Sequence, residues 1–206
     1  MMIFPDWPRP KSIELGSNNP NLVSESHSLR TQVRSRDVHR WMFKLTYGSL
    51  NRDEEAAIQA FCAAQRGRLN RFRYVPPVHA VPRGAASGSP KVHGSAHKRD
   101  LATGAMLVPT RGWTPSVNGI LKKRDFVAFN GHSKVYMLVD DASSDASGHA
   151  TLRIEPGLFA PVQDNETVIV WDMPFVCSLE ADTLSSKLTG GPWYDGIEIG
   201  LVERFE

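Results

Sequence analysis

The chain has 206 residues, of which 41% are hydrophobic and 22% are charged, and this composition is that of an ordinary globular protein with one large domain or two small ones. The 24 basic and 22 acidic residues leave a formal net charge of +2. This balance argues against a dedicated duplex-DNA binder, because such a protein carries a clear excess of Lys and Arg to neutralise phosphates.

Residues 1–36 are rich in Pro, Asn and Ser and show little apolar periodicity. The first ten residues lack the basic region and the apolar stretch of a signal peptide, and no window approaches the ~20 apolar residues of a membrane span. We therefore expect synthesis in a cytoplasm and no membrane binding. The polar residues 24–36 allow two interpretations, a strand that faces a partner or an extended arm.

A strand pattern follows in residues 39–47, where aromatic and aliphatic side chains occupy every second position. One face holds Trp41, Phe43, Leu45 and Tyr47, and the other holds Met42, Lys44 and Thr46. This period of two predicts a half-buried strand.

A helix is predicted over residues 52–66. Asn51 and Glu54 have the spacing of a capping box, and the acidic residues of the first turn suit the positive end of a helix dipole. Ile58, Phe61 and Cys62 follow at helical spacing among alanines that favour a helix, and Gly67 is a plausible stop. We expect the apolar side chains of this helix to pack against a sheet.

A second alternating run follows in residues 70–75 and ends at two prolines, which cannot donate to a β-ladder. Phe72 and Tyr74 share one face of this strand, and Arg71 and Arg73 share the other. The strand and helix patterns together predict a core made of Trp41, Phe43, Leu45, Ile58, Phe61, Phe72 and Tyr74.

Residues 79–118 have the composition of a loop, with a stretch rich in Gly, Ala, Ser and Pro at 84–94. Beyond them, short strands are predicted at 126–129, 135–139, 150–154 and 168–171, a pattern typical of a small barrel or sandwich. A last pair of strands is predicted at 175–179 and 196–205. The fold class is therefore mainly β (α+β), with one helix.

No metal or cofactor site emerges from the sequence. His93 and His97 are four residues apart, but the Gly/Ser-rich loop between them does not predict a helix that would hold both. A calcium loop is suggested by a run of alternating polar residues, Asp141, Ser143, Asp145 and Ser147. The pattern fails because Ala146 and Leu152 occupy the positions that require Gly and Glu, so a polar hairpin is expected.

No catalytic constellation emerges either, and we predict that the protein is not an enzyme. The run Gly131-His132-Ser133 lacks the second glycine of a nucleophile elbow, and single histidines such as His39 are more often structural than catalytic. The two cysteines, Cys62 and Cys177, are too few for a cysteine zinc site or a disulfide scaffold. We expect two free buried thiols, with a single disulfide as the alternative.

The strongest charge feature is a group of four arginines, Arg66, Arg68, Arg71 and Arg73. It could form a protein–protein interface, because arginine pairs with carboxylates and stacks on aromatic rings. The same residues could contact nucleic acid with help from Phe72 and Tyr74, or could be a solvated strand face. The interface is the interpretation that we favour.

The helix–strand segment 41–77 resembles the hub domain of phage distal tail proteins and of phage minor tail proteins of the lambda M type. The family pattern is matched by Glu54 or Glu55, Ile58, Phe61, Gly67, Phe72, Tyr74, Pro76 and Pro77. The run 196–205 resembles the closing strand of that family, and residues 112–170 resemble the β insert of its longer members.

The resemblance implies a hub made of residues 1–78 and 172–206, with a β-sandwich-like fold, and an inserted OB-like β-barrel at 79–171. It also implies a ring, typically a homohexamer, that joins the tail tube to the hub, tip and fibre proteins. Genomic DNA would pass through the ring only as cargo. The location would be the virion tail, assembled in the cytoplasm of a bacterial host, with the four arginines at a subunit interface.

Two other functions remain open on the sequence. A β module that binds carbohydrate or single-stranded nucleic acid predicts exposed aromatic side chains such as Trp113 and Trp171 on one face of the insert. A peptidoglycan-cleaving enzyme predicts a cleft with paired carboxylates or a zinc site, and no such set can be assembled from the sequence.

Overall fold

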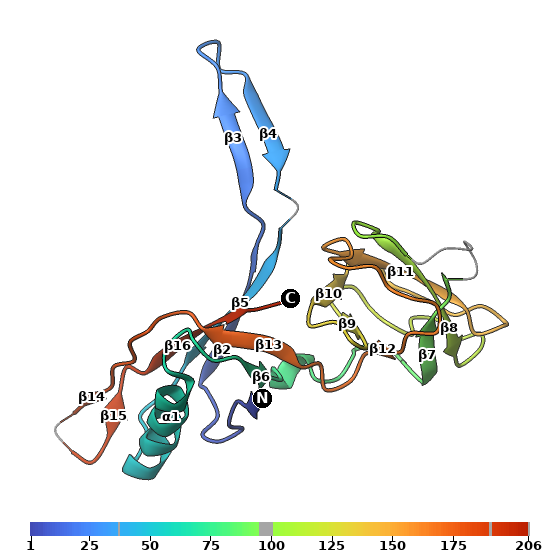
Figure 1. Cartoon of the computed structure of the whole chain (residues 1–206). Coiled ribbons are helices and arrows are strands. Elements are labelled where there is room, and N and C mark those ends of the chain that lie inside the picture. Colours follow the sequence, from blue (N-terminus) through green and yellow to red (C-terminus); the bar gives the residue numbers. More distant parts are fainter. Residues whose placement is uncertain (37, 95–100, 190, 206) are drawn as a thin grey trace. The chain divides into compact units, whose positions relative to one another are not determined.

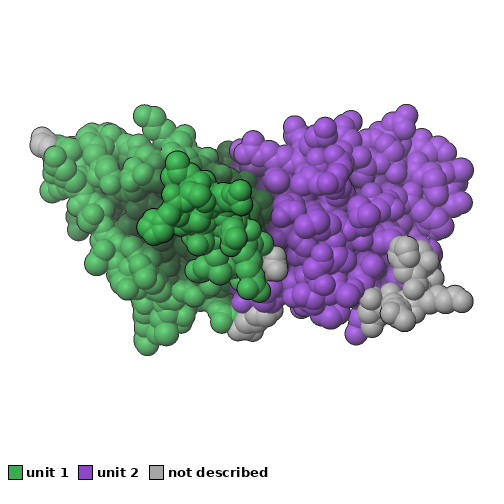
Figure 2. All heavy atoms as spheres, turned by 90° about the horizontal axis from the view of Figure 1, so that it is seen from above, with its two compact units in different colours: residues 1–73, 176–204 green, residues 74–175, 205–206 purple. Residues whose placement is uncertain are grey.

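The computed structural model describes residues 1–36, 38–94, 101–189 and 191–205. The chain divides into two compact units, one of residues 1–73 and 176–204 and the other of residues 74–175 with Phe205 (Figure 2). The predicted fold class is confirmed: the structure is mainly β with one α-helix, a six-stranded mixed sheet and a nearly closed, six-stranded antiparallel sheet. No helix among these residues is long and apolar enough to cross a membrane.

The first unit is built on the mixed sheet, whose strand order is β1-β6-β13-β16-β5-β2 (Figure 1). Its strands are β1 Met2–Ile3, β6 Phe72–Tyr74, β13 Phe175–Leu179, β16 Glu198–Glu203, β5 Arg40–Thr46 and β2 Ser12–Asn18. The predicted strands at 39–47, 70–75, 175–179 and 196–205 are therefore all present. Strand β2 was missed because only Ile13 and Leu15 alternate within it, which is too short a pattern to recognise.

Helix α1 spans Arg52–Gln65 and begins as predicted. The Asn51 side chain accepts hydrogen bonds from the backbone N–H groups of Asp53 and Glu54, both at 2.9 Å, and the Glu54 carboxylate accepts one from the backbone of Asn51 at 2.9 Å. The helix ends one residue earlier than predicted. Arg66 already has left-handed backbone angles, with φ 53°, and Gly67 continues the turn.

The helix buries Ile58, Phe61 and Cys62 in the first unit. The Phe61 ring lies 5.0 Å from that of Phe4 and 5.1 Å from that of Phe72, both edge-on, so the helix is fixed to strand β6 by aromatic contacts. The seven residues predicted as core are all buried: Trp41, Phe43, Leu45, Ile58, Phe61, Phe72 and Tyr74.

A separate two-stranded hairpin leaves this sheet between β2 and β5. It consists of β3 Asn21–Glu25 and β4 Thr31–Ser35, and every residue of both strands is exposed. Figure 1 shows the hairpin extending away from the sheet of its own unit. Of the two interpretations of residues 24–36, the extended arm matches this geometry. A smaller pair, β14 Lys187–Leu188 and β15 Tyr194–Asp195, joins the first unit near the C-terminus.

The second unit is the barrel-like sheet, with strand order β12-β9-β10-β11-β8-β7. Its strands are β7 Gly88–Val92, β8 Leu107–Trp113, β9 Phe126–Phe129, β10 Val135–Leu138, β11 Ala150–Glu155 and β12 Val168–Ile169, and the short 3-10 helix η1 Pro77–His79 precedes them. Lys91 and Thr167 form a β-bridge, and the Val92 N–H donates to the Glu166 carbonyl at 2.8 Å, so the first and last strands nearly close the sheet.

The prediction of a loop over residues 79–118 is wrong, because β7 and β8 lie within it. Gly88 and Gly112 both have positive φ, 102° and 86°, and a Cβ on either would clash with the backbone of the paired strand. Pro90 and Pro109 also lie inside these strands. Residues that usually mark loops therefore serve here to bring two strands close together at a bulge.

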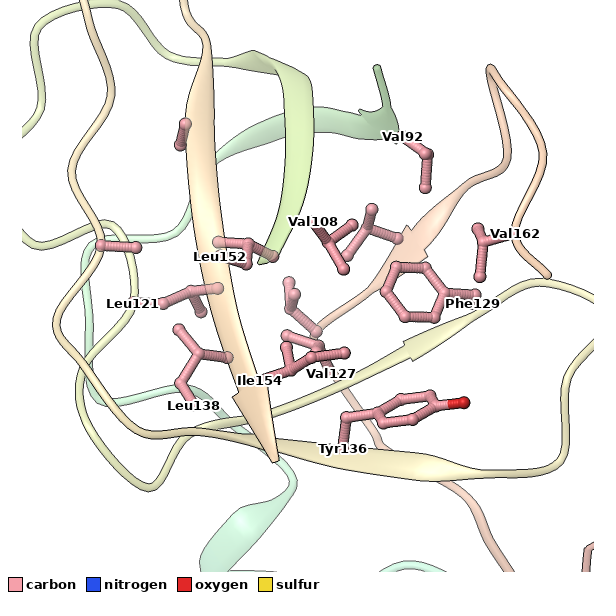
Figure 3. Close-up of a cluster of buried hydrophobic side chains, with 14 of the residues drawn as sticks. Val92, Val108, Leu121, Val127, Phe129, Tyr136, Leu138, Leu152, Ile154 and Val162 are labelled. Carbon is pink, nitrogen blue, oxygen red and sulfur yellow. The ribbon is translucent and has the colours of Figure 1, made fainter. Parts of the chain in front are cut away.

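Apolar side chains from all six strands fill the interior of the second unit (Figure 3). Fully buried members include Val92, Val108, Val127, Phe129, Tyr136, Leu138, Leu152 and Ile154. The Tyr136 hydroxyl accepts a hydrogen bond from the Phe159 backbone at 3.0 Å, so this polar atom is satisfied within the core. The barrel is thus a packed core and not a channel.

One buried carboxylate ties the beginning of the second unit to its sheet. Asp125 accepts hydrogen bonds from the backbone N–H groups of Arg83 at 3.1 Å, Gly84 at 3.3 Å and Lys122 at 2.8 Å. These three groups lie on two separate loops. The Asp125 side chain therefore holds the 83–84 segment against the turn that precedes β9.

We predict that Phe61→Ala lowers the free energy of unfolding by roughly 3–5 kcal/mol, because the change leaves a cavity between α1, Phe4 and Phe72. Urea denaturation followed by circular dichroism measures this loss. The exposed Leu69→Ala variant is the control and is expected to stay close to wild type. A negligible loss for Phe61→Ala would refute the packing of the helix.

We predict that Asp125→Ala lowers the stability of the second unit by about 3 kcal/mol, because several backbone N–H groups lose a charged acceptor. The matched control is Asp141→Ala, which removes an exposed carboxylate that accepts from the Lys123 N–H at 2.8 Å. Denaturation curves of the two variants are expected to differ clearly, and equal midpoints would contradict the role of Asp125.

Candidate subunit interface

Of the four predicted interface arginines, Arg66 and Arg68 lie on the turn after α1, Arg71 directly precedes β6, and Arg73 lies within that strand. Arg66, Arg68, Arg71 and Arg73 are all exposed. Because Phe72 and Tyr74 point into the core, Arg71 and Arg73 occupy the face of β6 that α1 does not cover. Arg68 has a carboxylate neighbour, Asp182, which accepts from its backbone N–H at 3.0 Å and lies 4.0 Å from its side chain.

Apolar side chains lie beside this arginine cluster. Strand β1 pairs with β6, with Met2 opposite Phe72 and Ile3 opposite Arg73. Met1, Met2 and Ile3 are all exposed, although Met and Ile are usually buried. Ile3 therefore shares the face of Arg73, whereas Met2 lies on the side of α1, where its sulfur accepts a hydrogen bond from the Gln65 side-chain amide at 3.4 Å.

The hairpin arm β3–β4 is the second surface feature, and its apolar content was not recognised in the sequence. Val23 and Val33 are directly opposite each other and are 66% and 63% exposed. Leu22 is paired with Arg34 on the other face. At the tip, the Ser26 N–H donates to the Arg30 carbonyl at 3.0 Å and closes the loop. The sequence of the arm shows no alternation of apolar and polar residues, because neither face of the hairpin is buried.

The sequence did not favour a metal site at His93 and His97, and the structure does not test this pair. His97 lies outside the described residues. The His93 ring stacks on that of His149, with centroids 4.9 Å apart and an interplanar angle of 23°. Stacked imidazoles do not direct their nitrogens at a common point. Within the described ranges, no group of three or more His, Cys, Asp or Glu residues is arranged to hold a metal ion.

The calcium-like run forms a polar turn, in agreement with the expected hairpin. One oxygen of Asp145 accepts from the backbone N–H groups of Ser147 and His149, both at 2.8 Å. These bonds, led by the one from His149, hold the pKa of the Asp145 carboxyl below its usual range. The carboxylate is thus engaged by its own turn, whose Gly148 has φ 74°.

Two further histidines, His39 and His132, have local structural partners. His39 is buried at the base of the arm, where its Nε2 lies 3.0 Å from the Ser17 hydroxyl and its ring meets Trp41 edge-on. In the second unit, His132 lies 3.2 Å from the Glu166 carboxylate. This pair borders a polar cavity of about 420 Å³, which is lined by Asn130, Gly131, His132, Pro161, Gln163, Asp164, Asn165 and Glu166.

A binding module predicts that Trp113 and Trp171 are both exposed, but the two side chains differ in exposure. Trp113 is 3% exposed, and its indole N–H donates to the Thr110 hydroxyl at 2.7 Å inside the barrel. Trp171 is 39% exposed. Trp113 therefore belongs to the core, and the two side chains do not form a joint stacking platform.

Cys62 and Cys177 are both free and buried, as expected from the sequence. Burial raises the pKa of the Cys62 thiol from an ordinary 9.0 to about 11, and burial, followed by the charge of Glu203, raises that of Cys177. Because the folded state raises these pKa values, it favours the thiol form. That contribution to stability is complete below pH 9 and is lost as the pH rises through the folded pKa.

No protein-family model matches the chain, and no curated protein matches it.

We predict that both thiols resist a thiol reagent at pH 8 in the native protein and react fully once it is unfolded, because burial suppresses the reactive thiolate. Absorbance of the released chromophore measures the reaction, and the Cys62→Ser and Cys177→Ser variants assign it. Reaction of either native thiol at the rate of a free cysteine would contradict its burial.

Proposed function

We propose that this protein is a structural subunit of a phage tail tip, which assembles into a ring of identical copies between the tail tube and the hub or fibre proteins. The observation that carries the proposal is the hairpin arm, whose ten strand residues are all exposed. The resemblance of residues 41–77 to distal tail proteins supplies the biological setting.

An arm of this kind lacks a packing partner within the described part of its own chain. An isolated two-stranded hairpin is at best marginally stable in water, since it buries no apolar face. The paired Val23 and Val33, together with Leu22, offer apolar surface on both faces of the arm. Contact with another protein surface would bury these side chains and stabilise the hairpin at the same time.

The features of the first unit suit self-association. The exposed Ile3 lies opposite Arg73, so apolar and arginine side chains meet on this face, as they do in protein–protein interfaces. Each copy carries an arm. When the arm of every copy binds the next copy in the same orientation, the contact repeats and links many copies. The proposed partners are therefore other copies of the chain, the tail tube protein and the tail hub, tip and fibre proteins. DNA is only cargo passing through the ring, in the virion tail.

The second candidate is a β module that binds a polyhydroxyl ligand such as a carbohydrate. Its support is the cavity beside His132 and Glu166, where side-chain amides and carboxylates converge. The burial of Trp113 and the two carboxylates of the cavity argue against single-stranded nucleic acid, which needs exposed aromatic rings and positive charge. Isothermal titration with cell-surface glycans tests this candidate.

We predict that Val23→Asp combined with Val33→Asp prevents ring formation without unfolding the protein, because both side chains are already exposed. Sedimentation velocity compares this variant with wild type, which is expected to self-associate. The matched control replaces two exposed valines of the second unit, Val78 and Val81, with Asp. It is expected to assemble normally.

Two results would contradict the proposal. A wild-type chain that stays monomeric at every concentration and never joins a larger assembly would exclude the ring. An arm variant that assembles as well as wild type would exclude the arm as the contact that supports it.

A further inference from the structure

The polar cavity of the second unit lies between two of its loops. One wall is the turn after β9, residues 130–132, and the other is the segment 161–166, which precedes β12. The volume of about 420 Å³ is within the usual range of small-molecule sites. Among the described residues that line the cavity, Pro161 is the one apolar side chain. A lipid or an apolar peptide, which is held by apolar burial, therefore does not suit it.

Both walls are fixed to the barrel by backbone hydrogen bonds. On the first wall, the Asn130 N–H donates to the Thr167 carbonyl at 3.0 Å. On the second wall, the Asn165 N–H donates to the Val92 carbonyl at 3.1 Å, and the Val92 N–H donates to the Glu166 carbonyl at 2.8 Å. The shape of the cavity is therefore set before a ligand arrives, and binding does not carry the cost of ordering a loop.

Glu166 gives the cavity a hydrogen-bond acceptor in a fixed position. Its side chain is 12% exposed, and its Oε1 lies 3.2 Å from the Nε2 of His132. Its Oε2 accepts from the Gln163 backbone N–H at 3.1 Å. Each carboxylate oxygen has two lone pairs, so Oε2 can accept one more hydrogen bond. Because a carboxylate accepts and does not donate, the ligand atom that meets it must carry a hydrogen, as a hydroxyl or an amine does.

The second carboxylate of the cavity, Asp164, is already engaged. Its Oδ1 accepts from the Gly94 N–H at 3.0 Å, and its Oδ2 accepts from the Asn165 side-chain amide at 3.0 Å. The Arg111 guanidinium lies 3.3 Å from Asp164 and donates to the Asn165 side-chain oxygen at 2.6 Å. These groups satisfy one another, which leaves Glu166 as the carboxylate that a ligand can use.

Each wall also contributes a side-chain amide, from Asn130 on one side and Gln163 on the other. Both residues are exposed, and neither amide forms a hydrogen bond to another described residue. An amide offers a carbonyl acceptor and an NH₂ donor side by side. Two hydroxyl groups on neighbouring carbons of a sugar ring can use both, because each hydroxyl donates and accepts. A carboxylate or a phosphate can use only the NH₂ group.

We propose that this cavity binds a neutral sugar through neighbouring hydroxyl groups, which donate to Glu166 and exchange hydrogen bonds with the amides of Asn130 and Gln163. The inference rests on the second candidate function and names its ligand class, a neutral sugar in preference to an acidic one. An acidic group of the ligand would set one acceptor against the Glu166 acceptor, with no hydrogen between them. Binding of this kind does not depend on the ring.

Matched pairs of sugars test the ligand class. The full chain is titrated with glucose and glucuronic acid, galactose and galacturonic acid, and N-acetylglucosamine and N-acetylmuramic acid, and the shifts of its amide resonances are followed by NMR. In each pair, the acid carries a carboxylate that its neutral partner lacks. At least one neutral sugar is expected to bind, and its acid is expected to bind roughly tenfold more weakly.

Substitutions in the two walls place the sugar in this cavity. Asn130→Ala and Gln163→Ala are each expected to weaken binding of the neutral sugar roughly three- to tenfold, because each removes hydrogen bonds to the ligand. The matched control, Asn118→Ala, removes an exposed amide of the same unit outside the cavity and is expected to bind like wild type. Glu166→Gln introduces a donor and is expected to narrow the preference for the neutral sugar over its acid. Circular dichroism verifies that each variant is folded.

The outcomes separate this inference from the candidate function on which it rests. If no neutral sugar shifts the resonances of wild type, the second candidate function fails and the inference fails with it, whereas the ring is untouched. If a sugar binds but Asn130→Ala and Gln163→Ala bind it as wild type does, the assignment to this cavity is overturned while the second candidate survives. An acid that binds as tightly as its neutral partner overturns the selectivity assigned to Glu166.

Discussion

The packing of α1 on one face of the mixed sheet is the contact on which the first unit depends. Phe61 lies between Phe4 and Phe72 and fixes which face of β6 is buried. Because strand side chains alternate, burying Phe72 on one face exposes Arg71 and Arg73 on the other. The same alternation in β5 buries Phe43 and Leu45 and exposes Lys44. The charged surface of the sheet thus follows from a hydrophobic contact on its opposite side.

Strong local patterns made part of this fold predictable. The capping box of Asn51 and Glu54, the alternation from Trp41 to Tyr47 and the apolar face of α1 are all set by neighbouring residues. Helix length and position could therefore be predicted to within one residue. Strands β7 and β8 could not, because Gly88 and Gly112 are required by a close backbone approach that appears only when the two strands pair.

The candidate surfaces also differ in whether local sequence predicts them or whether they depend on strand pairing. The four arginines of the cluster all lie within residues 66–73 and are visible in the sequence as a charge pattern. The arm was visible only as a polar stretch, because the pairing of Val23 with Val33 depends on the hairpin register. Registers between distant strands are set by tertiary structure, and local patterns do not encode them.

The central claim is that identical copies associate head-to-tail through the first unit. Native mass spectrometry of the purified full chain tests it most directly, since it counts copies in each species. A head-to-tail contact that closes predicts one dominant complex of more than two copies, with six expected from the resemblance. A protein found only as a monomer or as a two-copy complex, at any concentration and at low salt, would contradict the account.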